Sequence, residues 1–353
     1  ERGSLSHMPD EARQAKSAAA GGKQKNSIHG WVNINKPVGM GSTDVVRAVK
    51  RILRPEKVGH AGTLDPLADG VLPIALGEAT KTVPYLMEAR KTYHFTIRFG
   101  AETTTDDAEG EVVAENPTRP SIAEITAVLP QFTGEIEQVP PAYSAIKIDG
   151  QRAYDLARAG EAVAMKPRRI TVYSLEVASR VSRDTSSEGA WSVDRACQES
   201  AKAAKRSDSA ESRSASLQPQ AEDIHFIACV SKGTYIRSLA RDIARGAGAC
   251  GHVVRLHRAA VGKFTISEAI SLDLLEKVGH TGPQLLSMDW ALDDIPAIPV
   301  EEAAARRLCH GQPIPLAIQA PLVRIYCEER LIALAEERSG EWWPKRVFNN
   351  APS

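Results

Sequence analysis

Apolar and polar positions recur along the chain with two different periods, and they predict both helices and strands. Apolar residues with helical spacing (Val45, Val49 and Ile52) follow Ser42 and Thr43, either of which can cap a helix. Two further helices are predicted over residues 121–129 and 234–245. Alternation or short apolar runs predict strands over 71–76, 93–99, 170–177 and 224–230, after an apolar run at 31–34. The mixture indicates an α+β fold.

The pattern changes near Ile298, behind a proline-containing linker at residues 295–299. A short helix is predicted over 300–309, and Gly311 and Pro313 follow it. Short strands are predicted over 322–327 and 331–335. These elements indicate a small β-rich C-terminal domain.

Two segments lack helical or strand periodicity. Between residues 182 and 221, 18 of 40 residues are Ser or Ala, which predicts a disordered insertion within a hairpin. The first eight residues, ERGSLSHM, resemble the remnant of an expression tag, with Met8 as the native start. Residues up to 27 carry few apolar side chains, so disorder is predicted there as well.

Charge is segregated along the chain although the net charge is zero, with 44 basic and 44 acidic residues. Residues 225–265 contain seven Lys or Arg and a single acid, whereas residues 101–137 contain nine acids and a single base. A basic face for nucleic-acid phosphates can therefore coexist with overall neutrality. The simpler alternative is a solvated basic segment with no ligand.

Several classes of protein are disfavoured. The sequence contains no run of about 18 apolar residues and no secretory leader, so a cytoplasmic protein without a membrane partner is expected. The five cysteines form no C-x-x-C pair, which argues against a zinc site or a disulfide framework. Gly246, Gly248 and Gly251 spell G-x-G-x-x-G, but they follow a predicted helix instead of leaving a strand, so a dinucleotide site is not expected.

The segment GHAGTLDP, residues 59–66, concentrates functional groups. Asp65 precedes a proline in a loop bounded by glycines, so a turn presents its carboxylate. An Asx turn that satisfies its own backbone is the structural alternative. His60, Thr63 and Asp65 within six residues are more polar groups than such a turn requires, which favours a site.

This segment resembles the G-H-x-G-x-L-D-P loop of the TruB-type tRNA pseudouridine synthases, and further motifs of that family follow in order. NKPVGMGSTDVV resembles the N-terminal motif, KTYHFTIRFGAETTTDDAEG the K-x-Y motif with its acidic loop, and QVPPAYSAIKIDGQRAYDLARAG the substrate-clamping thumb. SKGTYIRSLARDI resembles the arginine motif, and HVVRLHRAAVGKF closes the catalytic domain. The resemblance covers residues 29 to about 270, apart from the insertion.

The resemblance implies three catalytic residues. Asp65 is the expected nucleophile, attacking either C1′ of the sugar or C6 of the uracil, a choice that the sequence leaves open. Arg237 is expected to keep this carboxylate ionised, since burial alone would favour its protonated form. Tyr93 is expected to stack on the uracil and to move protons. On sequence alone, Arg237 could equally be a solvated helix residue and Tyr93 a core residue.

Further residues are implied in substrate binding. His60 is expected to fill the stack after the target uridine is extruded. Lys36, Arg255 and Arg258 are candidates for phosphate contacts, and Tyr235 and Leu256 for the substrate pocket. The thumb, with Lys147, Arg152 and Tyr154, is expected to close over bound RNA.

The reaction isomerises a uridine without gain of atoms or redox change. Neither a cofactor nor a metal is therefore expected, and no nucleotide-binding motif is present. The implied substrate is uridine 55 in the T arm of tRNA, and the implied assembly is a monomer.

The implied fold is a pseudouridine-synthase domain with a mixed, mainly antiparallel central sheet flanked by helices, followed by a small β-barrel of PUA type. The expected boundaries are 1–27 for the tag and disordered start, 28–297 for the catalytic domain and 298–353 for the PUA-like domain. The thumb would lie at about 138–165 and the insertion at about 182–221. Two alternatives stay open: a non-catalytic RNA-binding or RNA-folding protein, and a guide-RNA-dependent relative that needs partner proteins.

Overall fold

The computed structural model describes residues 26–144, 146–148, 150–153, 165–178, 222–279 and 285–349. The disorder predicted for residues up to 25 and for the insertion at 182–221 lies outside these ranges, as does Tyr154 of the thumb. The side chains of Lys147 and Arg152 are not described either. The described residues form two compact units: those up to 94, with 229–233 and those from 255 to 349, in the first, and those between 95 and 228, with 234–254, in the second.

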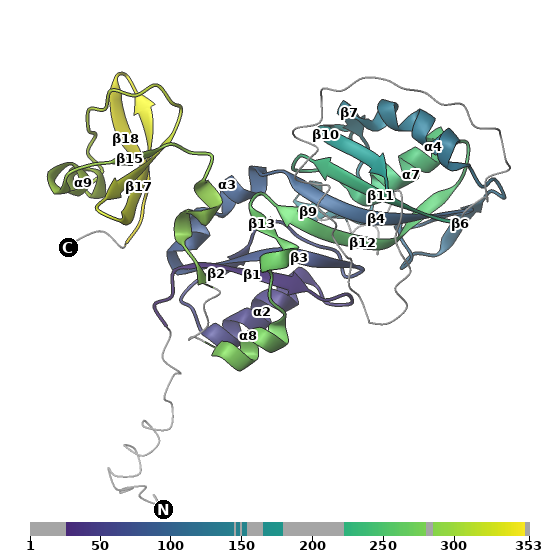
Figure 1. Ribbon diagram of the computed structural model, residues 1–353, viewed down its shortest axis with the longest axis horizontal. Coiled ribbons are helices and arrows are strands. Elements are labelled where there is room, and N and C mark those ends of the chain that lie inside the picture. Colours follow the sequence, from purple (N-terminus) through teal and green to yellow (C-terminus); the bar gives the residue numbers. More distant parts are fainter. Residues whose placement is uncertain are drawn as a thin grey trace, which may run out of the picture. The chain divides into compact units, whose positions relative to one another are not determined.

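A mixed sheet is the main element of the catalytic region, with strands in the order β14-β1-β3-β12-β4-β11-β10-β7, while β2 pairs with β3 and β13 with β12 (Figure 1). The strand bounds are β1 (Gly30–Lys36), β2 (Val58–His60), β3 (Ala68–Leu76), β4 (Lys91–Phe99), β7 (Gly134–Gln138), β10 (Arg168–Val177), β11 (Asp223–Val230), β12 (Gly251–Val261), β13 (Phe264–Thr265) and β14 (Leu285–Leu286). The pairs β1–β3, β2–β3 and β7–β10 are antiparallel, whereas β3 and β12 are parallel. The predicted mixed sheet with flanking helices is confirmed.

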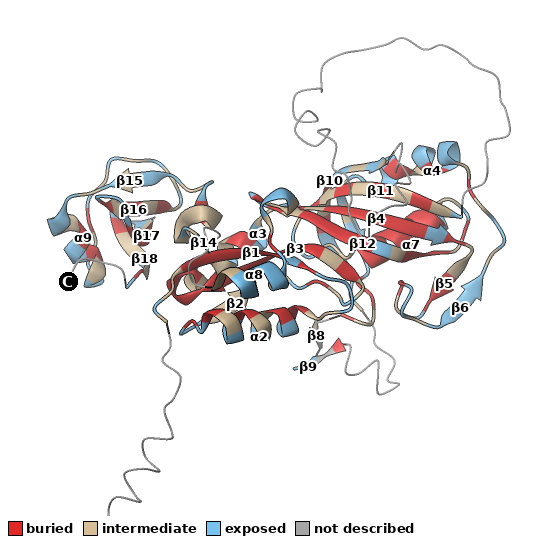
Figure 2. Ribbon diagram, turned by 60° about the horizontal axis from the view of Figure 1, so that its bottom comes forward, coloured by how far each residue is buried: buried red, intermediate tan, exposed pale blue. Residues whose placement is uncertain are grey.

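In the first unit, β3 lies between β1 and β12 and is buried along nearly its whole length. From Val71 to Leu76 its residues are apolar without alternation, which fits a strand covered on both faces. Helix α2 (Ser42–Leu53) buries Val45, Val49 and Leu53 and leaves its basic residues exposed (Figure 2). Helix α8 (Leu272–Val278) packs against α2.

The start of α2 differs from the sequence prediction. Gly41 occupies the N-cap position, and no side chain caps the helix. Ser42 is the first helical residue, and its hydroxyl binds the loop around Leu64 instead. A local pattern identifies a residue that can cap, but it carries no information about a partner 22 residues away.

In the second unit, α7 (Ile236–Gly246) and α4 (Ile122–Val128) are the long helical segments that were predicted. Ser121 caps α4 in a capping box with Glu124, as its position indicated. Strands β5 (Ala101–Thr103) and β6 (Val112–Glu115) form a hairpin from the acidic segment. Phe95 and Phe226 stack within the core at 5.3 Å between ring centroids. Strands β8 (Lys147–Ile148) and β9 (Gln151–Arg152) form a short hairpin in the predicted thumb.

The glycine triplet after α7 has the order expected of a helix terminator. Helix α7 ends at Gly246, Gly248 adopts a positive φ of 72° and Gly251 begins β12. A dinucleotide fingerprint needs the opposite order, from strand to helix.

The C-terminal region folds as a four-stranded sheet with one helix. Strands β15 (Ala297–Pro299), β16 (Val323–Cys327), β17 (Arg330–Arg338) and β18 (Glu341–Val347) pair in that order, and α9 (Glu302–Cys309) packs on the sheet. Trp342, Ile332 and Leu308 lie in its core. The predicted linker is partly structural, because residues 297–299 pair in parallel with β16. Sequence alternation missed this strand because proline at 296 and 299 obscures it.

Candidate active site

The loop that carries Asp65 joins β2 to β3 in the first unit and is held on both sides of the carboxylate. On one side, the Ser42 hydroxyl accepts a hydrogen bond from the Leu64 amide at 2.8 Å and donates one to the Leu64 carbonyl at 2.9 Å. On the other side, the Gly39 amide donates to the carbonyl of Pro66 at 2.8 Å. Leu64 is buried while Asp65 is half-buried, so the backbone is fixed and the carboxylate is accessible.

Lys36 belongs to this framework. It is fully buried, and its ammonium group donates to the carbonyls of Pro37, Met40 and Pro66 at 2.9, 2.6 and 3.5 Å. A buried ammonium bound to backbone carbonyls does not suit the phosphate contact expected from the sequence. In this conformation Lys36 ties the segment after Asp65 to residues 37–40.

Arg258 was expected at a phosphate as well, and it is 1% exposed. Its guanidinium donates to the carbonyls of Val71, Thr63 and Gly62 at 2.8, 3.3 and 3.1 Å. Burial excludes a phosphate contact in this conformation. Charge patterns along a sequence cannot distinguish an exposed arginine from one enclosed by carbonyl groups.

Tyr93 and Leu256 lie on one face of two neighbouring strands. His94 and His257, the next residues on β4 and β12, face each other with ring centroids 6.0 Å apart. Since successive side chains of a strand point to opposite faces, Tyr93 and Leu256 share the other face. Leu256 also pairs in register with Ala68, the first residue after the Asp65 loop. Both side chains are under 10% exposed, at 8% and 7%.

His60 ends β2 at the entrance to the loop and is partly buried. Burial, followed by the positive charge of Arg258, lowers the pKa of its imidazole. Its Nδ1 atom is buried and makes no hydrogen bond. The ring is therefore neutral at pH 7, a form that suits stacking between bases better than a cation bound to phosphate.

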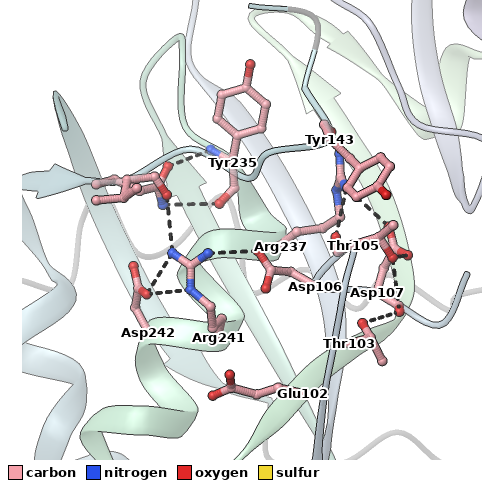
Figure 3. Close-up of polar contacts among 12 residues, drawn as sticks. Glu102, Thr103, Thr105, Asp106, Asp107, Tyr143, Tyr235, Arg237, Arg241 and Asp242 are labelled. Atoms are coloured by element: carbon pink, nitrogen blue, oxygen red, sulfur yellow. Dashed lines mark hydrogen bonds and ion pairs between the residues drawn. The ribbon is translucent and has the colours of Figure 1, made fainter. Parts of the chain in front are cut away.

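Arg237 lies in the second unit, on the first turn of α7, and is 6% exposed (Figure 3). Its guanidinium donates to the carbonyls of Thr105 and Tyr143 at 2.9 and 3.0 Å and lies 3.4 Å from an Asp107 carboxylate oxygen. Asp107 is itself buried and accepts from the Glu109 amide. The alternative of a solvated helix residue is excluded. The pairing of Arg237 with Asp65 stays a prediction.

The basic helix and the acidic segment neutralise each other. Arg241, one turn beyond Arg237, pairs with Asp106 at 2.8 Å (Figure 3). Arg245 pairs with Glu102 at 2.6 Å. The hydrogen bonds from Arg245 lower the pKa of Glu102. Lys232 and Lys263 pair with Glu88 and Asp293. Five of the seven basic residues in 225–265 therefore have an acidic partner in the structure, which reduces their net charge, and the basic face for phosphates stays a prediction.

Tyr235 forms the N-cap of α7, and its backbone is held by Gln138. The Gln138 side chain accepts from the Tyr235 amide at 2.9 Å and donates to its carbonyl at 3.1 Å. The phenol ring points away from the guanidinium of Arg237 (Figure 3). Sequence reasoning missed Gln138, Asp106 and Asp107 as supports, since only the observed turn 103–107 shows which acids of the segment face α7.

The histidine pair behind Tyr93 gives a testable pH dependence. Burial, with a smaller contribution from His257, lowers the pKa of His94 from 6.5 to about 4. The unfolded chain therefore binds a proton near pH 6.5 that the folded chain does not bind until about pH 4, so stability falls as the pH falls through this window. The loss is expected to be about 2–3 kcal/mol, since one pKa unit corresponds to roughly 1.4 kcal/mol.

Urea unfolding at pH 7.0 and pH 4.5 measures this loss, and His94→Phe supplies the comparison. Phenylalanine fits a buried strand position and does not titrate, so the variant should lose less stability between the two pH values than the parent protein. Equal losses in both proteins would show that His94 is not responsible.

Among the residues that the structure describes, no group of three His, Cys, Asp or Glu side chains could hold a metal ion. Within the same ranges, no helix combines the length and the apolar character that crossing a membrane would need. The four described cysteines, at 229, 250, 309 and 327, are free thiols.

Comparison with solved structures identifies the class of protein. The chain resembles a protein of the archaeal box H/ACA sRNP Nop10-Cbf5 complex, with a TM-score of 0.60 and 25% identity over 92% of this chain and 88% of that one. A chain of a Cbf5-Nop10-Gar1 complex matches equally well, with a TM-score of 0.60 and 25% identity over 91% and 85% of the two chains. Together with the Asp65 loop, this fold defines a pseudouridine synthase.

Sequence comparison identifies the family. The model of the TruB family pseudouridylate synthase N-terminal domain matches residues 50–199, and the model of the pseudouridine synthase II TruB C-terminal domain matches residues 296–348. tRNA pseudouridine synthase B of Rhodospirillum rubrum is 44% identical over 93% of this chain and 98% of its own length. The protein of the same name from Nitrobacter winogradskyi is 44% identical over 93% and 84%. The chain belongs to the TruB family of pseudouridylate synthases and is an isomerase.

Proposed function

We propose that this enzyme converts uridine 55 in the T loop of tRNA to pseudouridine, with Asp65 as its nucleophile. The observation that carries the proposal is the 44% identity, across 93% of the chain, to relatives named tRNA pseudouridine synthase B. The half-buried carboxylate on a backbone anchored on both sides supports the role of Asp65.

The other site residues would act around this carboxylate. Tyr93 would stack on the uracil and transfer protons, and Leu256, on the same face, would line the pocket. Arg237 would keep Asp65 ionised, and Tyr235 would contact the substrate from the start of α7. His60, neutral at pH 7, would fill the space left by the extruded base.

The C-terminal sheet would bind RNA outside the reacting loop as a module of PUA type. Its match to the TruB C-terminal model over residues 296–348 supports a family-specific domain. We further propose that the enzyme works as a cytoplasmic monomer, because the reaction requires neither a cofactor nor a second active site.

Incubation of an unmodified tRNA transcript with the purified protein, followed by chemical mapping of pseudouridine, tests the substrate. Modification at position 55 alone is expected, and a transcript with cytidine at that position should give no signal. Modification at another site would overturn the assignment. Activity that appears only when a guide RNA and partner proteins are added would favour the guide-dependent alternative, which the likeness to the Nop10-Cbf5 complex raises.

A further inference from the structure

Arg258 joins the two ends of the loop that carries Asp65. Two of its hydrogen bonds reach the carbonyls of Gly62 and Thr63, before the aspartate, and one reaches the carbonyl of Val71, after it. A single planar group thus fixes the separation of the two ends of a ten-residue segment. Ser42 binds the loop only before Asp65, and Lys36 binds it only after Asp65. Of these three side chains, Arg258 alone binds the backbone on both sides.

The backbone around Arg258 is built for this close approach. Arg258 pairs in register with Gly70, which adopts a φ of 103°. A Cβ atom at position 70 would lie 2.4 Å from the Arg258 carbonyl oxygen, so only glycine permits the contact. Gly62 also has a positive φ, of 95°, and a Cβ atom there would lie 3.5 Å from the guanidinium.

No carboxylate pairs with Arg258 among the described residues, and its guanidinium is bound by carbonyl oxygens alone. Lys91, on the face of β4 that also carries Tyr93, has the same type of environment, with its ammonium bound to the carbonyls of Met87 and Ala89. Burial, with the charge of Arg258 as a smaller cause, lowers the pKa of Lys91 to about 8. Burial of a cation that has no anionic partner destabilises the folded state. The burial of Arg258 against the Asp65 loop is therefore better explained by a role in function than by a role in stability.

We propose that Arg258 is a positioning residue for the isomerisation, which sets the place of the Asp65 carboxylate by holding Gly62 and Thr63 to β3 and β12. It touches neither the substrate nor the reacting atoms. This inference rests on the proposed role of Asp65. The planar fork is essential to it, because Nε and the two Nη groups of Arg258 point in fixed directions toward carbonyls on both sides of the loop, a geometry that a lysine ammonium does not have.

The variants Arg258→Lys and Arg258→Met separate geometry from charge. Lysine keeps the positive charge and loses the planar fork, while methionine loses both. We expect kcat to fall about 10- to 100-fold in both variants, because a displacement of about 1 Å of a reacting group costs rates of this order. The Kd for tRNA should stay within about threefold, since Arg258 is buried and contacts no phosphate.

Val261→Ala is the matched control. Val261 lies on the same strand and is fully buried. It belongs to the hydrophobic cluster that includes Ala61 and Val71, but its side chain makes no hydrogen bond to the Asp65 loop. This variant should lower the melting temperature while leaving kcat within about twofold. Amide hydrogen exchange of residues 62–65 should accelerate in both Arg258 variants and not in Val261→Ala.

Three results would overturn the inference. A kcat in Arg258→Lys close to that of the parent protein would show that charge alone matters. Unchanged exchange at residues 62–65, or a kcat loss in Val261→Ala as large as in the Arg258 variants, would reduce Arg258 to a stability residue. Since exchange is measured without substrate, it tests the positioning even if no tRNA activity is found, a result that would count against the proposed function separately.

Discussion

Replacement of Asp65 with asparagine is expected to reduce turnover by about 10⁴-fold or more, as for other covalent catalysts. Asparagine preserves the shape and most hydrogen bonds of the side chain, but it cannot supply the negative charge that attacks the substrate. RNA affinity should change little, because phosphate contacts and base stacking over a wide surface determine it. The backbone anchors at Leu64 and Pro66 do not involve the carboxylate, so the loop should stay in place.

Tritium release from tRNA labelled at C5 of uridine measures the turnover, and filter binding of the same RNA measures the affinity. If Asp65 served only an Asx turn, asparagine would replace it without loss. Residual turnover above a few per cent of the parent activity, with contamination excluded, would remove Asp65 from its assigned role. Asp69→Asn is a suitable control, since Asp69 binds His257 outside the loop.

Sequence patterns correctly predicted the elements that are determined by residues close to one another in the chain. The alternation in residues 170–177 and 224–230 became β10 and β11, and Ser121 caps α4 through bonds within four residues. The first strand of the C-terminal sheet and the cap of α2 were predicted incorrectly. In both cases the deciding partner is distant in sequence: β16 for residues 297–299, and Leu64 for Ser42.

Charged residues show the same limit more clearly. The sequence gives seven basic residues in one segment and nine acids in another, and a phosphate-binding face is a reasonable reading of the first. Folding places Asp106, Asp107 and Glu102 against successive turns of α7, so much of this charge is already neutralised. Since a buried and an exposed arginine look alike in a sequence, the structural roles of Lys36 and Arg258 could not be predicted from patterns.

Arg237→Met is expected to lower kcat by about 10³-fold at pH 7. About 10²-fold would come from a nucleophile that is no longer held in place, and up to about 10-fold from the carboxylate that is protonated once its charged partner is lost. The acid limb of the pH–rate profile should therefore move to higher pH, and part of the activity should return as the pH rises to 8.5. Asp107→Asn should lower kcat less, by about 10-fold. Arg237 keeps its hydrogen bonds to Thr105 and Tyr143 in this variant, but it loses the ion pair that helps to orient its guanidinium.

Arg245→Met provides the matched control on the same helix, two turns further on. Arg245 pairs with Glu102 through a half-exposed guanidinium, so its loss removes a charge and an ion pair of α7 without touching Arg237. Its kcat and the position of its acid limb should match those of the parent protein within about twofold, because Arg245 contacts none of the residues assigned to the site. Its loss leaves the buried Glu102 carboxylate without this partner and should therefore lower the melting temperature instead. Arg237 acts on the nucleophile only if its variant shifts the acid limb. A uniform loss of rate at every pH, with the limb unmoved, would instead assign Arg237 to the anchoring of Thr105 and Tyr143 around Asp107.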